Sequence, residues 1–288
     1  MSNSLISVSD FSNEDLKDIF EKISLFKTGE LKRDYKGCSV GLLFEKFSTR
    51  TRLSFEVAIS KLGAYPVYIN KTDTQLSRGE SIEETAKMFS LYLDALVYRT
   101  SNQKNIEDFA EFSDIPVINA LSDSEHPTQI ISDIFTIKEM KPERDISDLK
   151  IVYIGDGNNI ANSLSLIADT LDLNLTVCTP KGYEPSSRTY CTSNPIEAVQ
   201  DADVVYTDVW TSMGDEGEEK KRMKDFEDFQ INPALTKLSK KDYIFMHCLP
   251  AHIGEEVTKE VIESPNSAVY SQAENKQYTA MAIIDLFL

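Results

Sequence analysis

Five consecutive residues, 48–52, combine hydroxyl side chains with arginines in the order Ser-Thr-Arg-Thr-Arg. The apolar run 38–44 before them is typical of a buried strand, and a helical pattern follows them. The first N–H groups of a helix have no partner within it, and the helix dipole is positive there. This turn can therefore wrap a phosphate group, to which Arg50 adds a full charge. An ordinary helix start, capped by Ser48 with both arginines in solvent, is the alternative.

Two further residues that suit charge stabilisation lie near predicted strand ends. Arg99 ends the apolar strand 95–99, and His126 precedes Pro127 at the start of a predicted helix, 128–140. Because a residue before proline is held extended, His126 is directed away from that helix and across the strand ends. An arginine and an imidazole fixed beside a phosphate would stabilise negative charge on a carbonyl oxygen. Taken alone, Arg99 would more often be solvated or salt-bridged.

Candidate residues also follow strands in the second half of the chain. The segment 155–159, Gly-Asp-Gly-Asn-Asn, joins a strand to a helix as a dinucleotide site would, but it lacks the third glycine, and no acidic residue ends the next strand. Asp208 ends the strand 204–208, and its carboxylate suits an ammonium group. Cys248 ends the strand 244–248 after His247, where a buried cysteine beside a core histidine is the plainer interpretation.

These residues lie just past the carboxyl ends of predicted strands, where open α/β sheets bind ligands. The strands are predicted at 38–44, 65–69, 95–99, 116–120, 151–154, 175–179, 204–208 and 244–248, and helices at 13–27, 81–93, 128–140, 160–171 and 255–262. The helix after residues 48–52 is expected to bury Leu53, Val57 and Leu62 on one face and to end near Gly63.

This alternation predicts an α/β protein with two doubly wound parallel-sheet domains that face each other across a cleft. The polar run 141–148 separates a first domain, residues 1–140, from a second, residues 149–270. The apolar, helical segment 277–288 is too short to be a domain. We expect it to pack back on the first domain.

Composition narrows the classes of partner. The chain of 288 residues has a net charge of −17 and a pI of about 4.6, so its electrostatic field would repel nucleic acid. The four cysteines form no C-x-x-C pair and are accompanied by only three histidines, which favours a reduced, cytoplasmic protein without a structural metal. No signal peptide and no run of about 18 apolar residues is present, so we expect no membrane association.

The motif at 48–52 resembles the carbamoyl-phosphate signature of the aspartate/ornithine carbamoyltransferase family, and His-Pro-Thr-Gln at 126–129 matches that family as well. The resemblance covers nearly the whole chain. It implies a phosphate site made of Ser48, Thr49, Arg50 and Thr51. It further implies that Arg99, His126 and Thr51 polarise the carbonyl group, that Gln129 orients the carbamoyl group, and that no metal or organic cofactor is needed.

The second half of the chain resembles the ornithine branch of the family. Ser-Met-Gly at 212–214 matches a loop that closes over the amino acid, and His-Cys-Leu-Pro at 247–250 differs from the His-Pro-Leu-Pro of the aspartate branch. The resemblance implies that ornithine is held by Asn159, Asp208, Ser212 and Met213. It also places the Leu249 carbonyl and Cys248, which is not a covalent nucleophile, near the reacting amine and the carbamoyl group.

The implied reaction is attack of the neutral δ-amine of ornithine on carbamoyl phosphate, which gives citrulline and phosphate in arginine metabolism. Putrescine, N-acetylornithine and aspartate are alternative acceptors. Aspartate is disfavoured because residues 203–219 offer no cation for its side-chain carboxylate. Outside the family, the alternatives are an NAD-dependent dehydrogenase and a carbamoyl-phosphate-binding protein without turnover.

The resemblance also implies an oligomeric state, and the sequence differs from the family pattern at some positions. Gln75 lies in a polar loop that, in the family, reaches the neighbouring subunit's site, which implies a homotrimer or a multiple of trimers. Lys276 stands where the family motif Ala-Glu-Asn-Arg has arginine, so a planar fork is replaced by a point charge. The segment 183–194 looks shortened, and Ile253 occupies a position where arginine is common.

Overall fold

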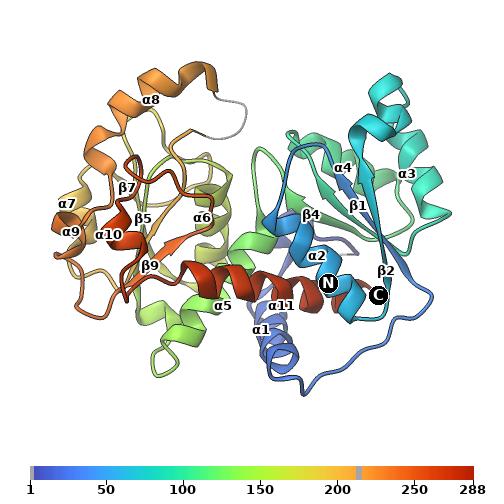
Figure 1. Ribbon diagram of the computed structural model, residues 1–288, viewed down its shortest axis with the longest axis horizontal. Coiled ribbons are helices and arrows are strands. Elements are labelled where there is room, and N and C mark those ends of the chain that lie inside the picture. Colours follow the sequence, from blue (N-terminus) through green and yellow to red (C-terminus); the bar gives the residue numbers. More distant parts are fainter. Residues whose placement is uncertain (1–2, 212–215) are drawn as a thin grey trace. The chain divides into compact units, whose positions relative to one another are not determined.

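The computed structural model describes residues 3–211 and 216–288, and the chain divides into two compact units (Figure 1). Unit 1 comprises Met1–Ser132 with Glu274–Leu288, and unit 2 comprises Asp133–Ala273. The divisions fall within two helices, α5 (Pro127–Met140) and α11 (Val269–Phe287). The C-terminal residues therefore belong to the first unit, as predicted.

Four parallel strands form the sheet of unit 1, in the order β2-β1-β3-β4. They are β1 (Ser39–Phe44), β2 (Tyr65–Asn70), β3 (Ala95–Arg99) and β4 (Val117–Leu121), close to the predicted positions. The central strands β1 and β3 are buried almost throughout, as parallel strands covered on both faces are. The helices of this unit are α1 (Asn13–Thr28), α2 (Arg50–Lys61), α3 (Ile82–Ser90) and α4 (Gln103–Phe112), with short 3-10 turns η1 (Val8–Asp10), η2 (Lys71–Asp73) and η3 (Gln75–Arg78).

The buried face of α2 differs from the prediction. Leu53 and Val57 are 53% and 38% exposed, whereas Phe55, Ile59 and Leu62 are buried. The buried residues fall at positions i, i+4 and i+7, which form one stripe of the helix toward β1 and β2. The prediction was therefore right for Leu62 and wrong for Leu53 and Val57, which point outward.

Five parallel strands form the sheet of unit 2, in the order β7-β6-β5-β8-β9. They are β5 (Lys150–Ile154), β6 (Asn174–Cys178), β7 (Cys191–Thr192), β8 (Val204–Thr207) and β9 (Ile244–His247). The helices are α6 (Asn159–Leu171), α7 (Pro195–Val199), α8 (Glu219–Asp225), α9 (Pro233–Thr236) and α10 (Lys259–Ile262), with η4 (Ile146–Asp148), η5 (Glu216–Glu218) and η6 (Glu227–Phe229). The helix predicted at 255–262 is limited to α10, and the C-terminal helix begins earlier than predicted, at Val269. Among the described residues, no helix is both long and apolar enough to cross a bilayer.

In each sheet, the order of the strands reverses between two central neighbours. These are β1 and β3 in unit 1 and β5 and β8 in unit 2. The carboxyl ends of strands at such a reversal form the usual binding crevice of an open α/β sheet. In unit 1 these ends lead to residues 45–49 and to Arg99, and in unit 2 to residues 155–158 and to Asp208. The topology thus places predicted site residues of each unit at its own reversal point.

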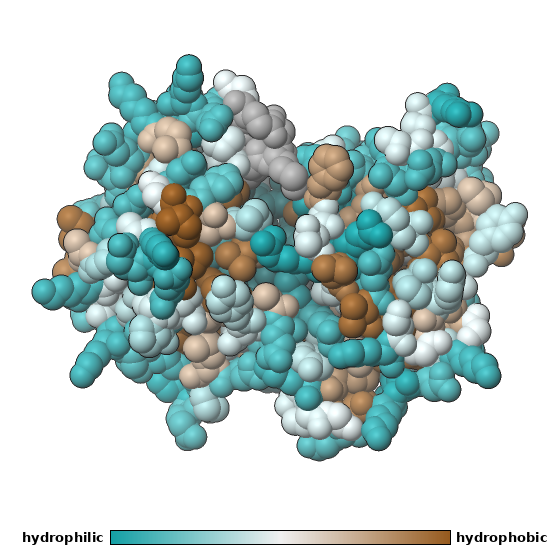
Figure 2. Space-filling view, viewed as in Figure 1, coloured by the Kyte–Doolittle hydropathy of each residue, from teal (hydrophilic) through white to brown (hydrophobic). Residues whose placement is uncertain are grey.

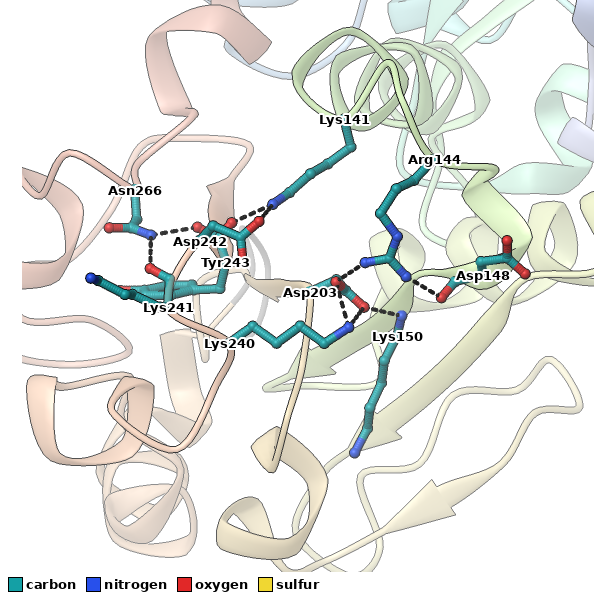
Figure 3. Close-up of polar contacts among 10 residues, drawn as sticks. All are labelled: Lys141, Arg144, Asp148, Lys150, Asp203, Lys240, Lys241, Asp242, Tyr243 and Asn266. Atoms are coloured by element: carbon teal, nitrogen blue, oxygen red, sulfur yellow. Dashed lines mark hydrogen bonds and ion pairs between the residues drawn. The ribbon is translucent and has the colours of Figure 1, made fainter.

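The opposite, amino-terminal edge of the unit 2 sheet is held by ion pairs (Figure 3). The Asp203 carboxylate accepts hydrogen bonds from Lys240 at 2.8 Å, from the Lys150 backbone N–H at 2.9 Å, and from Arg144. Burial by itself would raise the pKa of Asp203, but the hydrogen bonds from Lys240, the Lys150 backbone and Arg144 lower it overall. These bonds join the segment before β5 to the starts of β8 and β9.

Candidate functional site

The turn after β1 in unit 1 has the geometry of an anion site. The first backbone bond of α2 is donated by the Leu53 N–H to the Thr49 carbonyl at 3.0 Å, so the preceding N–H groups have no acceptor inside the helix. Thr49, rather than Ser48, is the residue that precedes the helix, and its side chain makes no cap hydrogen bond. The hydroxyl of Ser48 lies 3.4 Å from the Arg52 N–H, a long contact. An ordinary serine cap therefore does not account for this turn.

The two arginines of the turn differ in their surroundings. The Arg52 guanidinium lies 3.4 Å from the centre of the Tyr68 ring, and its Nε is 2.9 Å from a carboxylate oxygen of Glu56. Arg50 is half-buried at the first position of α2, and within residues 3–211 and 216–288 it forms no ion pair. Arg50 is thus the arginine whose charge can serve an anion at the helix start.

Five polar residues of unit 1 are buried although they come from separate elements. They are Thr51 (3% exposed), Arg99 (6%), His126 (4%), Gln129 (1%) and Lys276 (7%). Buried polar groups of this kind are costly unless they are hydrogen-bonded or serve a ligand. All five were predicted as site residues, and the structure places all five in unit 1.

Lys276 joins two of these residues directly. Its Nζ donates to Oε1 of Gln129 at 2.6 Å and to Oγ1 of Thr51 at 3.1 Å. The three residues come from α11, α5 and α2, which are far apart in the sequence. The Lys276 ammonium and the Thr51 hydroxyl, which lies in the first turn of α2, therefore belong to one hydrogen-bonded group.

His126 lies at the start of α5, immediately before Pro127. Its carbonyl accepts the N–H groups of Gln129 and Ile130, so its side chain lies outside the helix, as the proline predicts. Burial lowers the pKa of His126 well below its usual value, and the charges of Lys276 and Arg99 lower it further. The imidazole is therefore neutral near pH 7 and carries one N–H donor.

In unit 2, Asp208 is the centre of a second polar group. Its Oδ1 accepts from the Cys248 thiol at 3.0 Å and its Oδ2 from Nδ2 of Asn158 at 2.9 Å. The Asn158 side chain also caps α6 through the N–H groups of Ile160 and Ala161. Asn158 was not predicted as a site residue, although an asparagine just before a helical run is a recognisable N-cap. The predicted Asn159 is half-buried as the first residue of α6.

The glycine segment before α6 is not shaped for a dinucleotide. The N–H of Gly157 donates to the Tyr183 carbonyl at 2.9 Å, and a Cβ atom at Gly157 would lie 2.3 Å from that oxygen and from the Pro185 nitrogen. In a dinucleotide fingerprint, the corresponding glycine lets the backbone approach a pyrophosphate. Here Gly157 is required because residues 183–185 of the same chain pack against it. This close packing explains the glycine without a bound nucleotide.

His247 is buried, as the plainer interpretation predicted, whereas Cys248 beside it is only half-buried. Its Nδ1 accepts the Leu249 N–H at 2.9 Å, and its Nε2 lies 3.0 Å from a carboxylate oxygen of Glu256. His247, Asp208 and Cys248 each bring a possible metal ligand within 4.8 Å of the others. Because both ring nitrogens of His247 are already engaged, only two ligands are left, fewer than a structural zinc site uses.

Arg222, in the helix α8 after the predicted amino-acid loop, is a cation whose charge is already paired. Its guanidinium lies 2.9 Å from Oδ2 of Asp156 and donates to the Trp210 carbonyl at 2.9 Å. It therefore does not supply an unbalanced positive charge for the side-chain carboxylate of an acceptor.

The predicted site residues still to be located are Gln75, Ser212, Met213 and Leu249. Gln75 is exposed in η3. Ser212 and Met213 lie outside the described residues. The predicted Leu249 follows Cys248 in unit 2, where its backbone φ of 59° is in the left-handed region that side chains rarely adopt.

Both halves of the chain match domains of one protein family. Residues 3–139 match the domain described as "Aspartate/ornithine carbamoyltransferase, carbamoyl-P binding domain", and residues 147–287 match "Aspartate/ornithine carbamoyltransferase, Asp/Orn binding domain". The chain is 52% identical to the ornithine carbamoyltransferase of Caldicellulosiruptor saccharolyticus over 88% of this chain and 89% of that one. It is 45% identical to the enzyme of Thermococcus kodakarensis over 99% and 96%.

Solved structures agree with these sequence matches. The ornithine carbamoyltransferase of Pyrococcus furiosus superposes with a TM-score of 0.93 at 44% identity and covers 98% of this chain and 96% of its own. The enzyme of Thermus thermophilus gives a TM-score of 0.93 at 36% identity, over 100% of this chain and 99% of its own. The likeness therefore extends over both units.

Proposed function

Because the chain belongs to the aspartate/ornithine carbamoyltransferase family, we propose that it transfers the carbamoyl group of carbamoyl phosphate to the δ-amine of L-ornithine. The products are L-citrulline and phosphate. A relative from Pyrococcus furiosus is named an anabolic ornithine carbamoyltransferase, which supports a role in arginine biosynthesis. The observation that carries ornithine as the acceptor is the Asp208 carboxylate held by the Cys248 thiol of the ornithine-type motif.

Carbamoyl phosphate binds residues 1–140 together with the helix 277–288. The phosphate lies at the start of α2, where unpaired N–H groups, hydroxyls and Arg50 meet a dianion. The residues assigned to phosphate are Ser48, Thr49, Arg50 and Thr51. A loop with Gln75 completes this site from a neighbouring subunit.

The carbonyl of carbamoyl phosphate is polarised by Arg99, His126 and Thr51. As the amine attacks, negative charge grows on the carbonyl oxygen, and donors fixed before the reaction stabilise it without reorganisation. The lowered pKa of His126 makes it a neutral donor, so the site does not depend on protonating the imidazole. Gln129 and Lys276 complete the set around the carbamoyl group. Phosphate is a good leaving group, so alignment supplies much of the rate.

Ornithine binds residues 149–270. The Asp208 carboxylate receives the α-ammonium group, with Asn159, Ser212 and Met213 around the amino acid. Cys248 and the carbonyl of Leu249 lie beside the reacting amine and the carbamoyl group. An aspartate acceptor would bring a second carboxylate toward Asp208, and Arg222 is already paired with Asp156.

We also propose a homotrimer or a multiple of trimers. Unit 1 exposes Phe47 (92%), Leu53 (53%), Val57 (38%) and Tyr65 (69%), and Figure 2 shows hydrophobic atoms over α2. Apolar groups that gather on a surface mark protein–protein contacts. Sedimentation tests the assembly, and mixing inactive Gln75→Ala and Arg50→Ala chains should restore partial activity. Full activity from a monomer would contradict the proposal.

The four cysteines carry thiols rather than disulfides, which supports a reducing, cytoplasmic location.

The test of the function is citrulline formation from carbamoyl phosphate and ornithine by the purified chain. We expect saturable turnover in the parent and a large loss in Arg50→Ala. Binding of carbamoyl phosphate without citrulline would indicate a protein that has lost turnover. A higher kcat/KM with putrescine, N-acetylornithine or aspartate would reassign the acceptor.

A further inference from the structure

Contacts of the Lys276 ammonium with Gln129 and Thr51 assign orientations to these two neighbours. The ammonium lies 2.6 Å from Oε1 of Gln129 and 3.1 Å from Oγ1 of Thr51, and the lysine side chain is buried. An ammonium group has three donors and no acceptor. The carboxamide oxygen of Gln129 must therefore face Lys276, and the amide nitrogen lies on the other branch.

Lys276 orients the Thr51 hydroxyl in the same way. Because its oxygen accepts a proton from Lys276, its own proton points to another group. Thr51 lies in the first turn of α2, next to Arg50. Lys276 thus turns two groups that could accept hydrogen bonds into groups that present donors. The oxygens of a carbamoyl and a phosphoryl group are acceptors, so donors are what such a ligand requires.

We propose that Lys276 is a positioning residue, which acts on the ligand through Gln129 and Thr51 rather than by holding the carbamoyl oxygen by itself. This inference rests on the proposed carbamoyl-phosphate site. An arginine at this position would bind differently. Its planar guanidinium reaches two acceptors in one plane, whereas the ammonium group of a lysine directs single hydrogen bonds.

Contacts along α11 hold Lys276 in place. The preceding residue, Asn275, is fully buried and accepts from Lys27 of α1 at 2.8 Å. Nearer the C-terminus, the Asp285 carboxylate accepts from Lys22 at 2.6 Å, and it is also bonded by Arg33 and Tyr35. The ammonium is therefore supplied by a helix that is fixed on both sides of it, as preorganisation of a polar site requires.

The charge of Lys276 has a second consequence, for His126. The charges of Lys276 from α11 and of Arg99 from β3 both favour the neutral form of this imidazole. The carboxylate of the adjacent Glu125 accepts the Val8 N–H at 3.1 Å through Oε2. Removing the Lys276 charge should therefore raise the pKa of His126, whatever the ligand.

The decisive test is a double-mutant cycle on carbamoyl-phosphate binding, measured by calorimetry on the full chain. We expect Lys276→Met and Gln129→Ala each to weaken Kd on the order of tenfold to a hundredfold, as loss of a charge-assisted bond does. The double variant should be little weaker than Lys276→Met, because that change already releases the Gln129 amide that Gln129→Ala removes. Losses that multiply would show that Lys276 binds the ligand independently and would overturn the proposal.

Two further variants make the result specific. Gln129→Glu keeps an oxygen for Lys276 but has no amide donor, so it should lose as much affinity as Gln129→Ala. Lys17→Met removes the same charge from an exposed position on α1 and should leave Kd unchanged. Thermal unfolding of each variant identifies any that fail to fold, and Lys276→Arg then tests the site with the charge retained. Because a guanidinium also has donors and no acceptor, Lys276→Arg should keep affinity, and adding Gln129→Ala should remove what Lys276→Arg retains; a loss in Lys276→Arg as large as that of Lys276→Met contradicts the proposal.

Titration of the histidines by NMR does not depend on activity. The chain has three histidines, and the His252→Gln variant removes the signal of the exposed one. Lys276→Met should raise the pKa of His126, and Lys17→Met should not. If the pKa of His126 is unchanged in Lys276→Met, the electrostatic part of the inference is wrong. If the pKa of His126 rises in Lys276→Met but the parent protein makes no citrulline, the proposed function is wrong and the electrostatic interaction between Lys276 and His126 is still supported.

Discussion

The thiol of Cys248 donates a hydrogen bond to Oδ1 of Asp208 at 3.0 Å, across the carboxyl ends of β9 and β8. Oδ2 of the same carboxylate accepts from Asn158 at 2.9 Å. Both oxygens are thus oriented, and the carboxylate is 7% exposed. Asp208 and Cys248 form a preorganised pair of unlike groups, one that suits an ammonium and one that can contact an amine.

Asp208→Asn should weaken the use of ornithine selectively. The variant loses the charge that meets the α-ammonium group, so we expect kcat/KM for ornithine to fall on the order of tenfold to a hundredfold. The Kd for carbamoyl phosphate should be unchanged, because that ligand is assigned to the other unit. Steady-state kinetics and calorimetry check the two statements, and equal losses for both ligands would refute this assignment.

Cys248→Ser should remain active. A hydroxyl can still donate to Asp208, so we expect kcat/KM within about tenfold of the parent, whereas Cys248→Ala should lose more because it leaves Oδ1 of Asp208 without that donor. Mass spectrometry under single-turnover conditions should find no carbamoylated Cys248. A trapped covalent adduct on the thiol, together with an inactive serine variant, would establish a nucleophile instead.

Arg50 and Arg52 form a matched pair for testing the phosphate turn. Arg50→Ala should cost about 2 to 5 kcal/mol of carbamoyl-phosphate binding, because a partly desolvated dianion loses its charged partner. Arg52→Ala removes a guanidinium that stacks on Tyr68 and pairs with Glu56, so it should affect stability more than binding. Calorimetry on both variants decides the point, and a larger binding loss in Arg52→Ala would reverse the assignment.

The Asp203 carboxylate should make the free energy of unfolding depend on pH in the acidic range. Its pKa is lowered in the folded protein from the ordinary 3.8, so its contribution is present above pH 3.8 and is lost as pH falls through the folded value. Asp203→Ala removes the carboxylate that accepts from Lys240, Arg144 and the Lys150 N–H, and should lower the free energy of unfolding at pH 7 by about 1 to 3 kcal/mol. Urea unfolding at pH 7 and below pH 3.8 provides the comparison. If Asp203→Ala and the parent differ in free energy of unfolding by the same amount at both pH values, the Asp203 carboxylate is not the source of the acid dependence.

The strand ends were predictable from sequence because each central strand is a short apolar run followed by a polar turn. Arg99 and His126 follow from that pattern together with the proline after His126. Lys276 was placed in the site through family resemblance alone, since no periodicity connects it with Thr51 or Gln129. Its bonds to both residues are visible only in the structure.

The misses have local causes. Leu53 and Val57 are apolar, yet the stripe made by Phe55, Ile59 and Leu62 is the one that packs on the sheet. Asn158 was passed over for its neighbour Asn159, although the helix start assigns it the capping position. The two-residue strand β7 and the four-residue helix α9 are too short to produce a period in the sequence.

The most direct test of the account offers ornithine, putrescine, N-acetylornithine and aspartate at equal concentration with 13C-labelled carbamoyl phosphate, and follows the products by NMR. The account predicts that citrulline takes nearly all of the label in the parent. In Asp208→Asn, citrulline formation should fall while carbamoyl phosphate still binds. Label that appears mainly in another carbamoylated amine, or carbamoyl phosphate that remains unconsumed, would contradict the central claim.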